Sequence, residues 1–285
     1  MAYEEYDPWQ LRELQRISTL ILAEMDRVCS ELDIPYFIYA GTAIGSIRHG
    51  GFIPWDDDID IGMFRSDYER FLEEAPSALG ADFYITNGIT DEHFPACNSN
   101  LSLAGTYCVP SEFDKCEFQY PIGIGIFAFD RVSDDAGIRR KQLRRTWLWG
   151  RVAFLRETGS PNLFIKGWRR ALVASICRVA HFILTSFHVS QRWIHGQWQK
   201  AARLAENEDG DLFADFTDGD PLRWSVKKTE VFPLKRVLFE TIEVSGAKNM
   251  DTILRRGYGD YMKLPPEEER KNHHPSRLDF GKFSS

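Results

Sequence analysis

The sequence predicts an α/β (α+β) protein with a central sheet flanked by helices, and three kinds of stretch carry this prediction. Residues 11–32 place apolar side chains three and four apart, which predicts one amphipathic helix with Asp7 as its N-cap. Residues 36–39 form a short apolar run, and the alternation of acids and isoleucines from Asp58 onward is also typical of a strand. Residues 122–130 predict a longer apolar strand.

An acidic cluster at residues 56–60 is the most informative stretch, because it holds four carboxylates within five residues. Their repulsion near neutral pH is tolerable only with solvent, bound protons or a cation among them. Side chains on a strand point to opposite faces in turn, so Asp58 and Asp60 share one face while Ile59 and Ile61 face a core. Such oxygen groups suit a hard cation, magnesium or manganese. The EF-hand alternative fails, because Ile61 stands where that loop needs glycine.

Glycines follow the first short strand and predict a turn that opens a short helix. They let the backbone approach a ligand closely, and the amides at a helix start attract anions. A phosphate-binding turn beside metal-binding carboxylates is the apparatus of phosphoryl or nucleotidyl transfer. We therefore predict that Gly41, Thr42, Gly45 and Ser46 cradle phosphate and that Arg48 offers it a bidentate contact.

Two motifs resemble the LicD family, which includes bacterial phosphorylcholine transferases and, more distantly, fukutin-related protein. The acidic motif runs through Gly51-Phe52-Ile53-Pro54-Trp55-Asp56-Asp57-Asp58-Ile59-Asp60-Ile61-Gly62-Met63, preceded by Gly41-Thr42 and Arg48-His49. The closing motif comprises Tyr258-Gly259-Asp260-Tyr261-Met262-Lys263-Leu264-Pro265-Pro266, Arg270 and His273-His274. This resemblance implies a nucleotidyltransferase-like fold and transfer of a phospho-alcohol from a CDP-activated donor to a glycan hydroxyl, with release of CMP.

For that reaction we expect the metal ion to be held by Asp58 and Asp60. Asp56 is a further ligand or an outer partner of one, and Asp57 points away. The metal neutralises the diphosphate of the donor, and magnesium commonly keeps several waters of its own.

Other candidate residues come from the second half of the chain. The resemblance alone places Asp260, His273 and His274 near the site, since adjacent histidines without nearby cysteine or acid spacing are usually not a metal site. Residues 230–244 predict two strands around Lys235, whose charge either meets a phosphate or lies at an exposed turn.

Gly125 is the main departure from the family pattern, in which the corresponding strand usually carries a third active-site aspartate. The metal is then held by the remaining acids with phosphate and water, or another acid such as Glu117 or Asp130 reaches the site, or catalysis is impaired. Loss of a catalytic base would lower the rate roughly 10²- to 10⁴-fold. Two alternatives stay open: a nucleotidyltransferase acting on a small molecule or glycan, and a catalytically impaired nucleotide- or glycan-binding protein.

The charge pattern divides the chain into three parts. We expect a catalytic core at residues 1–135, a basic, tryptophan-rich helical insertion at 136–205, and a C-terminal part at 206–285 that completes the catalytic domain and begins with an acidic loop or boundary. Residues 139–203 carry fourteen Lys or Arg and one acid, although the whole chain has a net charge of -7. Basic helices with tryptophan suit an anionic membrane surface. A helical hairpin packed on the core is the alternative.

The remaining features concern location and other partners. Five irregularly spaced cysteines and a start without a secretory pattern predict a cytoplasmic protein, held at the inner face of the membrane where the basic part binds it. Residues 171–187 are too short for a membrane span and contain Arg178. No nucleic-acid-binding motif is present, so we expect no nucleic-acid partner.

Overall fold

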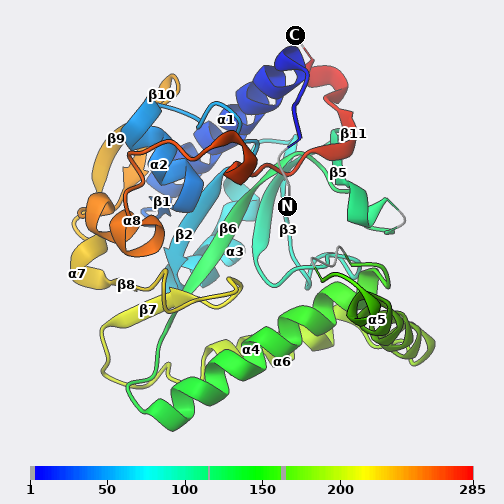
Figure 1. The fold of residues 1–285 in the computed structure, drawn as a ribbon. Coiled ribbons are helices and arrows are strands. Elements are labelled where there is room, and N and C mark those ends of the chain that lie inside the picture. The colour runs from blue at the N-terminus through cyan, green and yellow to red at the C-terminus, as the bar shows by residue number, and fades with distance from the viewer. Residues whose placement is uncertain (1–3, 115, 162–164, 285) are drawn as a thin grey trace.

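The computed structural model describes residues 4–114, 116–161 and 165–284, and its centre is a mixed sheet (Figure 1). Five strands lie in the order β1 (Phe37–Ile38), β2 (Asp60–Phe64), β6 (Gly123–Arg131), β4 (Ser99–Leu103) and β3 (Phe83–Thr86). β7 (Leu212–Asp215) pairs with the end of β6, and β8 (Val226–Lys227) pairs with β7. β2 and β6 are parallel, and the other pairs are antiparallel. The predicted α/β class is confirmed.

The predicted N-terminal helix is α1 (Pro8–Glu31), which packs across β4 and β6. The Asp7 side chain accepts hydrogen bonds from the amides of Trp9 and Gln10, as expected of an N-cap. Ile17 and Ile21 on its inner face are completely buried. The three- and four-residue spacing of apolar side chains therefore identifies the face that packs on the sheet.

The other elements of this body lie around the sheet. The helices are α2 (Ala40–His49), α3 (Arg65–Ala78), α7 (Lys228–Val231) and α8 (Met250–Tyr258), with short 3-10 helices at Ser111–Phe113, Glu267–Glu269 and Gly281–Phe283. Two further strand pairs are β9 (Lys235–Phe239) with β10 (Ile242–Gly246), and β5 (Tyr107–Pro110) with β11 (Pro275–Asp279). The last pair joins the C-terminal end of the chain to its middle.

Three helices form a separate group below the sheet in Figure 1: α4 (Ala136–Glu157), α5 (Trp168–Ser186) and α6 (Gln191–Ala202). α4 and α6 lie side by side over a second hydrophobic cluster that includes the completely buried Ile194 and the 1% exposed Trp198. The buried Gln142 of α4 donates to the carbonyls of Arg131 and Ala202, 2.8 and 2.7 Å away. α4 and α6 therefore pack inward, as the hairpin alternative expects.

α5 differs from its two neighbours, because Cys177 is its single buried residue among those that the structure describes. In these described residues no one helix has the length and apolar composition to cross a membrane. α5 and α6 meet that requirement as a pair, but the pair is bent by 113°.

Four local expectations differ from the structure. β2 begins at Asp60, two residues later than the alternation predicts. The glycine turn is already helix, since α2 begins at Ala40. The acidic stretch expected to be a loop contains β7, whose ladder with β6 buries Phe213 and Ala214. The two strands expected around Lys235 are instead a hairpin with that residue at the start of β9. Its turn follows Phe239, where Glu240 is left-handed and donates its amide to the Gly50 carbonyl.

Candidate active site

The acidic cluster lies at the start of β2, where the strand joins the centre of the sheet. Ile59 and Ile61 are completely buried, so the alternation predicts their face correctly. Asp60 is the register partner of Gly125 on β6, and the Asp58 side chain is 39% exposed. The chain thus buries the two isoleucines, whereas the neighbouring Asp58 side chain stays partly exposed.

Thr42 of α2 fixes the position of Asp60. Its hydroxyl accepts a hydrogen bond from the Asp60 amide at 2.9 Å, and the Thr42 side chain is buried. The neighbouring Tyr39 amide donates to the Asp60 carbonyl at 3.0 Å. Thr42 was predicted to bind phosphate, and the contact it makes here is to the strand that carries the candidate metal ligand.

We predict that Thr42→Val destabilises the protein by roughly 1–3 kcal/mol, because it leaves the Asp60 amide without an acceptor. Thr42→Ser keeps the hydroxyl and should restore most of the loss. Urea unfolding of the three proteins checks this. Equal stability of the valine and serine variants would contradict it.

His273, near the end of the chain, is in direct contact with the cluster. Its amide donates to Asp57 at 2.7 Å, and its Nδ1 lies 3.3 Å from an Asp57 oxygen and 3.2 Å from an Asp58 oxygen. Hydrogen bonds to these two carboxylates raise the pKa of His273 to about 11. The imidazolium therefore bridges two aspartates that would otherwise repel each other.

Asp57, which we expected to point away, has a carboxylate oxygen within 4.8 Å of one of Asp58. Its second oxygen accepts a hydrogen bond from the Tyr6 hydroxyl at 2.6 Å. Asp57 is buried, and both of its carboxylate oxygens are bound by Tyr6 or His273. Asp57 therefore holds His273 and the N-terminal segment in place.

The closing motif lies over the acidic motif as a strap, residues 270–274. The Arg270 guanidinium lies 4.3 Å from the centre of the Trp55 ring. The His274 ring lies 4.4 Å from the ring of Tyr6. The Asn272 side chain also exchanges two hydrogen bonds with the backbone of Glu4. The two motifs that sequence analysis singled out, more than 200 residues apart, thus meet at one place.

The electrostatics of the cluster fit a cation. Burial, and then the charge of Asp58, raise the pKa values of both Asp56 and Asp60 well above the ordinary range. Burial would also raise the pKa of Asp58, but the hydrogen bond and charge of His273 lower it below its usual value. Because several partly buried carboxylates that lie close together favour a positive partner, the donor set suits an oxygen-liganded divalent ion.

The predicted phosphate-binding residues have different surroundings. A Cβ at Gly41 would lie 2.8 Å from an Asp56 oxygen, so this glycine sits against the cluster. The guanidinium of Arg48 donates to the Tyr261 carbonyl. A Cβ at Gly45, however, would lie 2.3 Å from the Gly51 carbonyl, and the Ser46 hydroxyl donates to Leu238 on β9 at 2.8 Å. The last two positions serve the packing of α2.

Lys235 and Asp260 are exposed, and among the described residues neither forms a hydrogen bond or ion pair with the cluster. The partner of Lys235 in the hairpin is Gly246, and the neighbouring Arg236 is paired with Asp26. A phosphate contact of Lys235 and a role for Asp260 therefore rest on the resemblance.

The acids proposed to replace the aspartate missing at Gly125 are engaged elsewhere. Asp130 forms a buried bidentate pair with Arg65, at 2.8 and 2.6 Å. Glu117 lies 3.0 Å from His93 and is 78% exposed. Asp215 and Asp218, which sequence reasoning missed, instead act on Asp60 by their charge, and burial raises the pKa of Asp215 to about 7. The available sequence signal was an aspartate directly after the apolar run Leu212-Phe213-Ala214.

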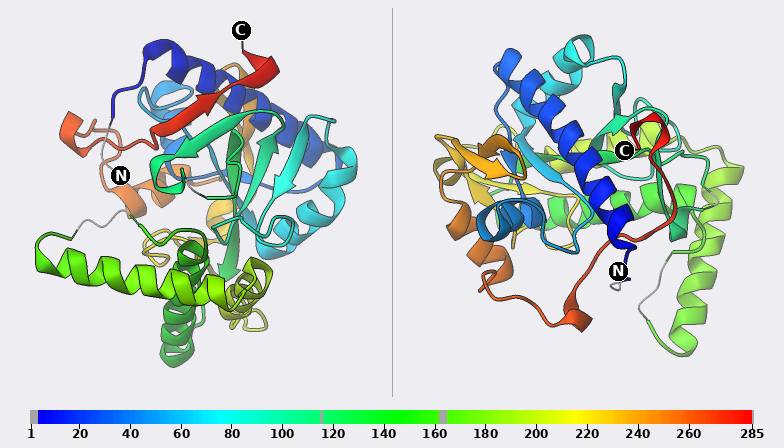
Figure 2. Two further views of the ribbon diagram at one scale, coloured as in Figure 1. Left: turned by 90° about the vertical axis from the view of Figure 1, so that its right-hand side faces the viewer. Right: turned by 90° about the horizontal axis from the view of Figure 1, so that it is seen from above.

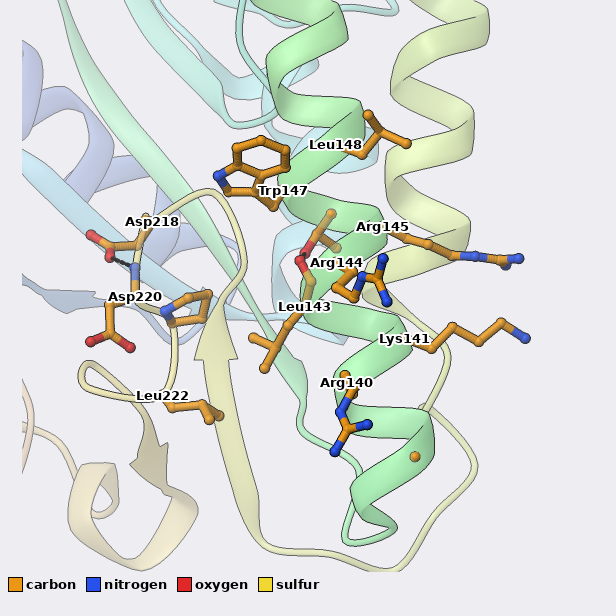
Figure 3. A pocket seen from close by; sticks show the side chains of 14 residues that line it. Arg140, Lys141, Leu143, Arg144, Arg145, Trp147, Leu148, Asp218, Asp220 and Leu222 are labelled. Carbon is orange, nitrogen blue, oxygen red and sulfur yellow. Dashed lines mark hydrogen bonds between the residues drawn. The ribbon is translucent and has the colours of Figure 1, made fainter. Parts of the chain in front are cut away.

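A groove is lined in part by the loop that carries Asp218. Its volume is about 760 Å³, and it is lined by α4 and by residues 218–222. Figure 3 shows Leu143 facing the loop, while Lys141 and Arg145 extend away from it. Asp218 therefore lines this groove and also acts on Asp60 by its charge.

A mixed sheet with clustered aspartates at the start of a central strand is the arrangement expected of a nucleotidyltransferase-type domain. Residues 33–96 match the family model described as "LicD/FKTN/FKRP, nucleotidyltransferase domain". The chain is 28% identical over 276 residues to the lipopolysaccharide cholinephosphotransferase LicD of Haemophilus influenzae, covering 93% of this chain and 96% of that protein. A shorter match, 36% identical over 56 residues, is to an uncharacterized protein of Rickettsia typhi, covering 20% of this chain and 18% of that protein. The chain is thus similar to the LicD family over residues 33–96 and to one LicD protein along nearly its whole length.

Proposed function

We propose that this protein transfers a phospho-alcohol, phosphocholine or a similar group, from a CDP-activated donor to a hydroxyl of a cell-surface glycan. The observation that carries the proposal is the meeting of the two family motifs at Asp58, where His273 from the strap contacts the acidic cluster. The similarity to a lipopolysaccharide cholinephosphotransferase along nearly its whole length supports the same class of reaction.

In this reaction the acceptor oxygen forms a bond to the phosphorus that carries the alcohol. The bond from that phosphorus to the bridging oxygen breaks, CMP leaves with the electron pair, and the acceptor proton passes to water. Asp58 and Asp60 would hold magnesium or manganese, which supplies positive charge to the diphosphate. Thr42 keeps Asp60 in place, and the strap closes one side of the cluster.

The test is release of CMP from CDP-choline, CDP-ethanolamine, CDP-glycerol and CDP-ribitol in the presence of magnesium, with and without a purified lipopolysaccharide acceptor. We expect one donor to be preferred and the acceptor to gain its phospho-alcohol. Release of pyrophosphate from CTP, with the nucleoside monophosphate on the product, would instead establish the nucleotidyltransferase alternative.

The second candidate, a catalytically impaired nucleotide- or glycan-binding protein, rests on Gly125. A Cβ built there lies 3.3 Å from an Asp60 oxygen, so an aspartate would point at the cluster. It would also lie 2.7 Å from the ring of Phe127, which occupies the space.

We predict that Gly125→Asp alone is destabilising by roughly 1–3 kcal/mol, the usual range for overpacking. Gly125→Asp/Phe127→Ala removes the clash, with Phe127→Ala as its control. If the native protein turns over a donor, the double variant should not exceed it by more than a few-fold. Turnover by the double variant alone would favour the impaired-protein alternative.

A further inference from the structure

α5 presents a continuous apolar stripe to solvent. Its large side chains recur every three or four residues and fall on one face of the helix: Trp168, Leu172, Ile176, Val179, Ile183 and, at the C-cap, Phe187. Trp168 is 73% exposed and Phe187 is 77% exposed. Phe182, 68% exposed, widens the stripe. A contiguous patch of this kind on a soluble protein marks an interaction site.

The opposite face attaches α5 to the rest of the molecule. Cys177 is buried there, and the His181 ring donates from Nδ1 to the Leu155 carbonyl of α4 at 2.9 Å. The Arg156 side chain holds the chain just beyond α5 by donating to the Val189 carbonyl at 2.8 Å. Figure 2 shows α5 along the outer edge of the molecule, so the stripe is free to meet a flat partner.

The charges around the stripe have one sign. At about 3.6 residues per turn, Arg169 falls at one edge of the stripe and Arg178 at the other, and both are exposed. The Arg169 guanidinium also lies 5.7 Å from the centre of the Trp168 ring. The sequence holds no Asp or Glu between Glu157 and Glu206. The partner of this face must therefore offer apolar contact and negative charge together.

We propose that α5 lies in the surface of an anionic lipid bilayer. The apolar stripe enters the boundary of the acyl chains, and the flanking arginines meet the head groups, the arrangement of an interfacial amphipathic helix. A second copy of the chain is a poor occupant, since it would bring arginines against arginines without an acid between them. α4 and α6 bury their apolar side chains against each other and the rest of the protein, so these side chains are not available to enter a bilayer. The proposal is independent of the transfer reaction, because binding needs no donor.

The experiment is sedimentation of the full chain with vesicles, in two compositions: phosphatidylcholine alone, and phosphatidylcholine with phosphatidylglycerol. Ile176→Glu/Phe182→Glu places two acids on the stripe, and Leu20→Glu/Ile89→Glu places two on exposed apolar positions elsewhere. Arg169→Ala/Arg178→Ala tests the charges, with Arg12→Ala/Lys248→Ala as its control. Circular dichroism confirms that each variant is folded.

We expect the native chain to bind the phosphatidylglycerol vesicles, and both α5 variants to lose about tenfold or more in partitioning. The two control variants should bind like the native chain. Absence of binding by the native chain, or equal losses in the controls, would overturn the proposal. A native dimer that the glutamates dissociate, without vesicle binding, would show that the stripe is an interface between copies and would also overturn it.

Discussion

Asp60→Asn is expected to lower CMP release from the preferred donor by roughly 10³-fold while leaving the fold intact. Asn has the same shape but no charge, so the proposed metal ligand is lost, and the proposed reaction depends mainly on positioning and charge neutralisation. The Asp60 amide still donates to Thr42, because the substitution does not touch the backbone. Activity at saturating magnesium, measured beside Asp82→Asn on the surface, checks the expectation.

Although Asp60→Asn should lower the activity, it should not lower the stability of the fold. Burial and the neighbouring Asp58 raise the pKa of Asp60, so the ionised carboxylate costs stability that increases as the pH rises above the ordinary pKa of an aspartate. Removing that charge should leave the urea midpoint at neutral pH unchanged or higher. A variant that is inactive because it is unfolded would show a lower midpoint, and activity within tenfold of the native chain would exclude Asp60 as a ligand.

The acidic cluster could be predicted from sequence because its evidence is local. Strand alternation alone places Ile59 and Ile61 in the core, and both are completely buried. The roles of individual residues in α2 could not be predicted. Gly45 packs against the Gly51 backbone, and the Ser46 hydroxyl donates to the Leu238 carbonyl. A glycine needed for close packing of two backbone segments has the same sequence signal as one that approaches a phosphate.

Long-range contacts account for the rest of what the sequence did not show. Tyr6 reaches Asp57, and His273 reaches it from the other end of the chain, although no spacing rule links such distant positions. β7 was hidden because its segment is rich in acids, and its pairing with β6 prevails over that composition. α5 was predicted to be part of a basic helical region. Its difference from α4 and α6 could not be predicted, because it depends on which helix faces pack against the rest of the protein.

The buried pair of Arg65 and Asp130 carries the second large expectation. Arg65 begins α3 directly after β2, and Asp130 lies near the end of β6, so the pair joins the two parallel strands on which the site is built. Burial lowers the pKa of Arg65, but the charge and hydrogen bonds of Asp130 more than offset this and raise it. Arg65→Met should destabilise the protein by about 3–5 kcal/mol, because it leaves an unpaired carboxylate in the interior.

Comparison with a surface ion pair shows whether the loss of stability comes from burial of the remaining charge or from loss of an ion pair alone. Arg70→Met removes a partner of Glu74 in a pair whose side chains are 44% and 39% exposed, and should cost under about 1 kcal/mol. Arg65→Met/Asp130→Leu removes both buried charges and should recover most of the stability lost in Arg65→Met. Urea unfolding of the native chain and these three variants measures the differences. If the double variant is as unstable as the single one, the pair contributes by shape and hydrogen bonding, since leaving one charge alone would then add no cost.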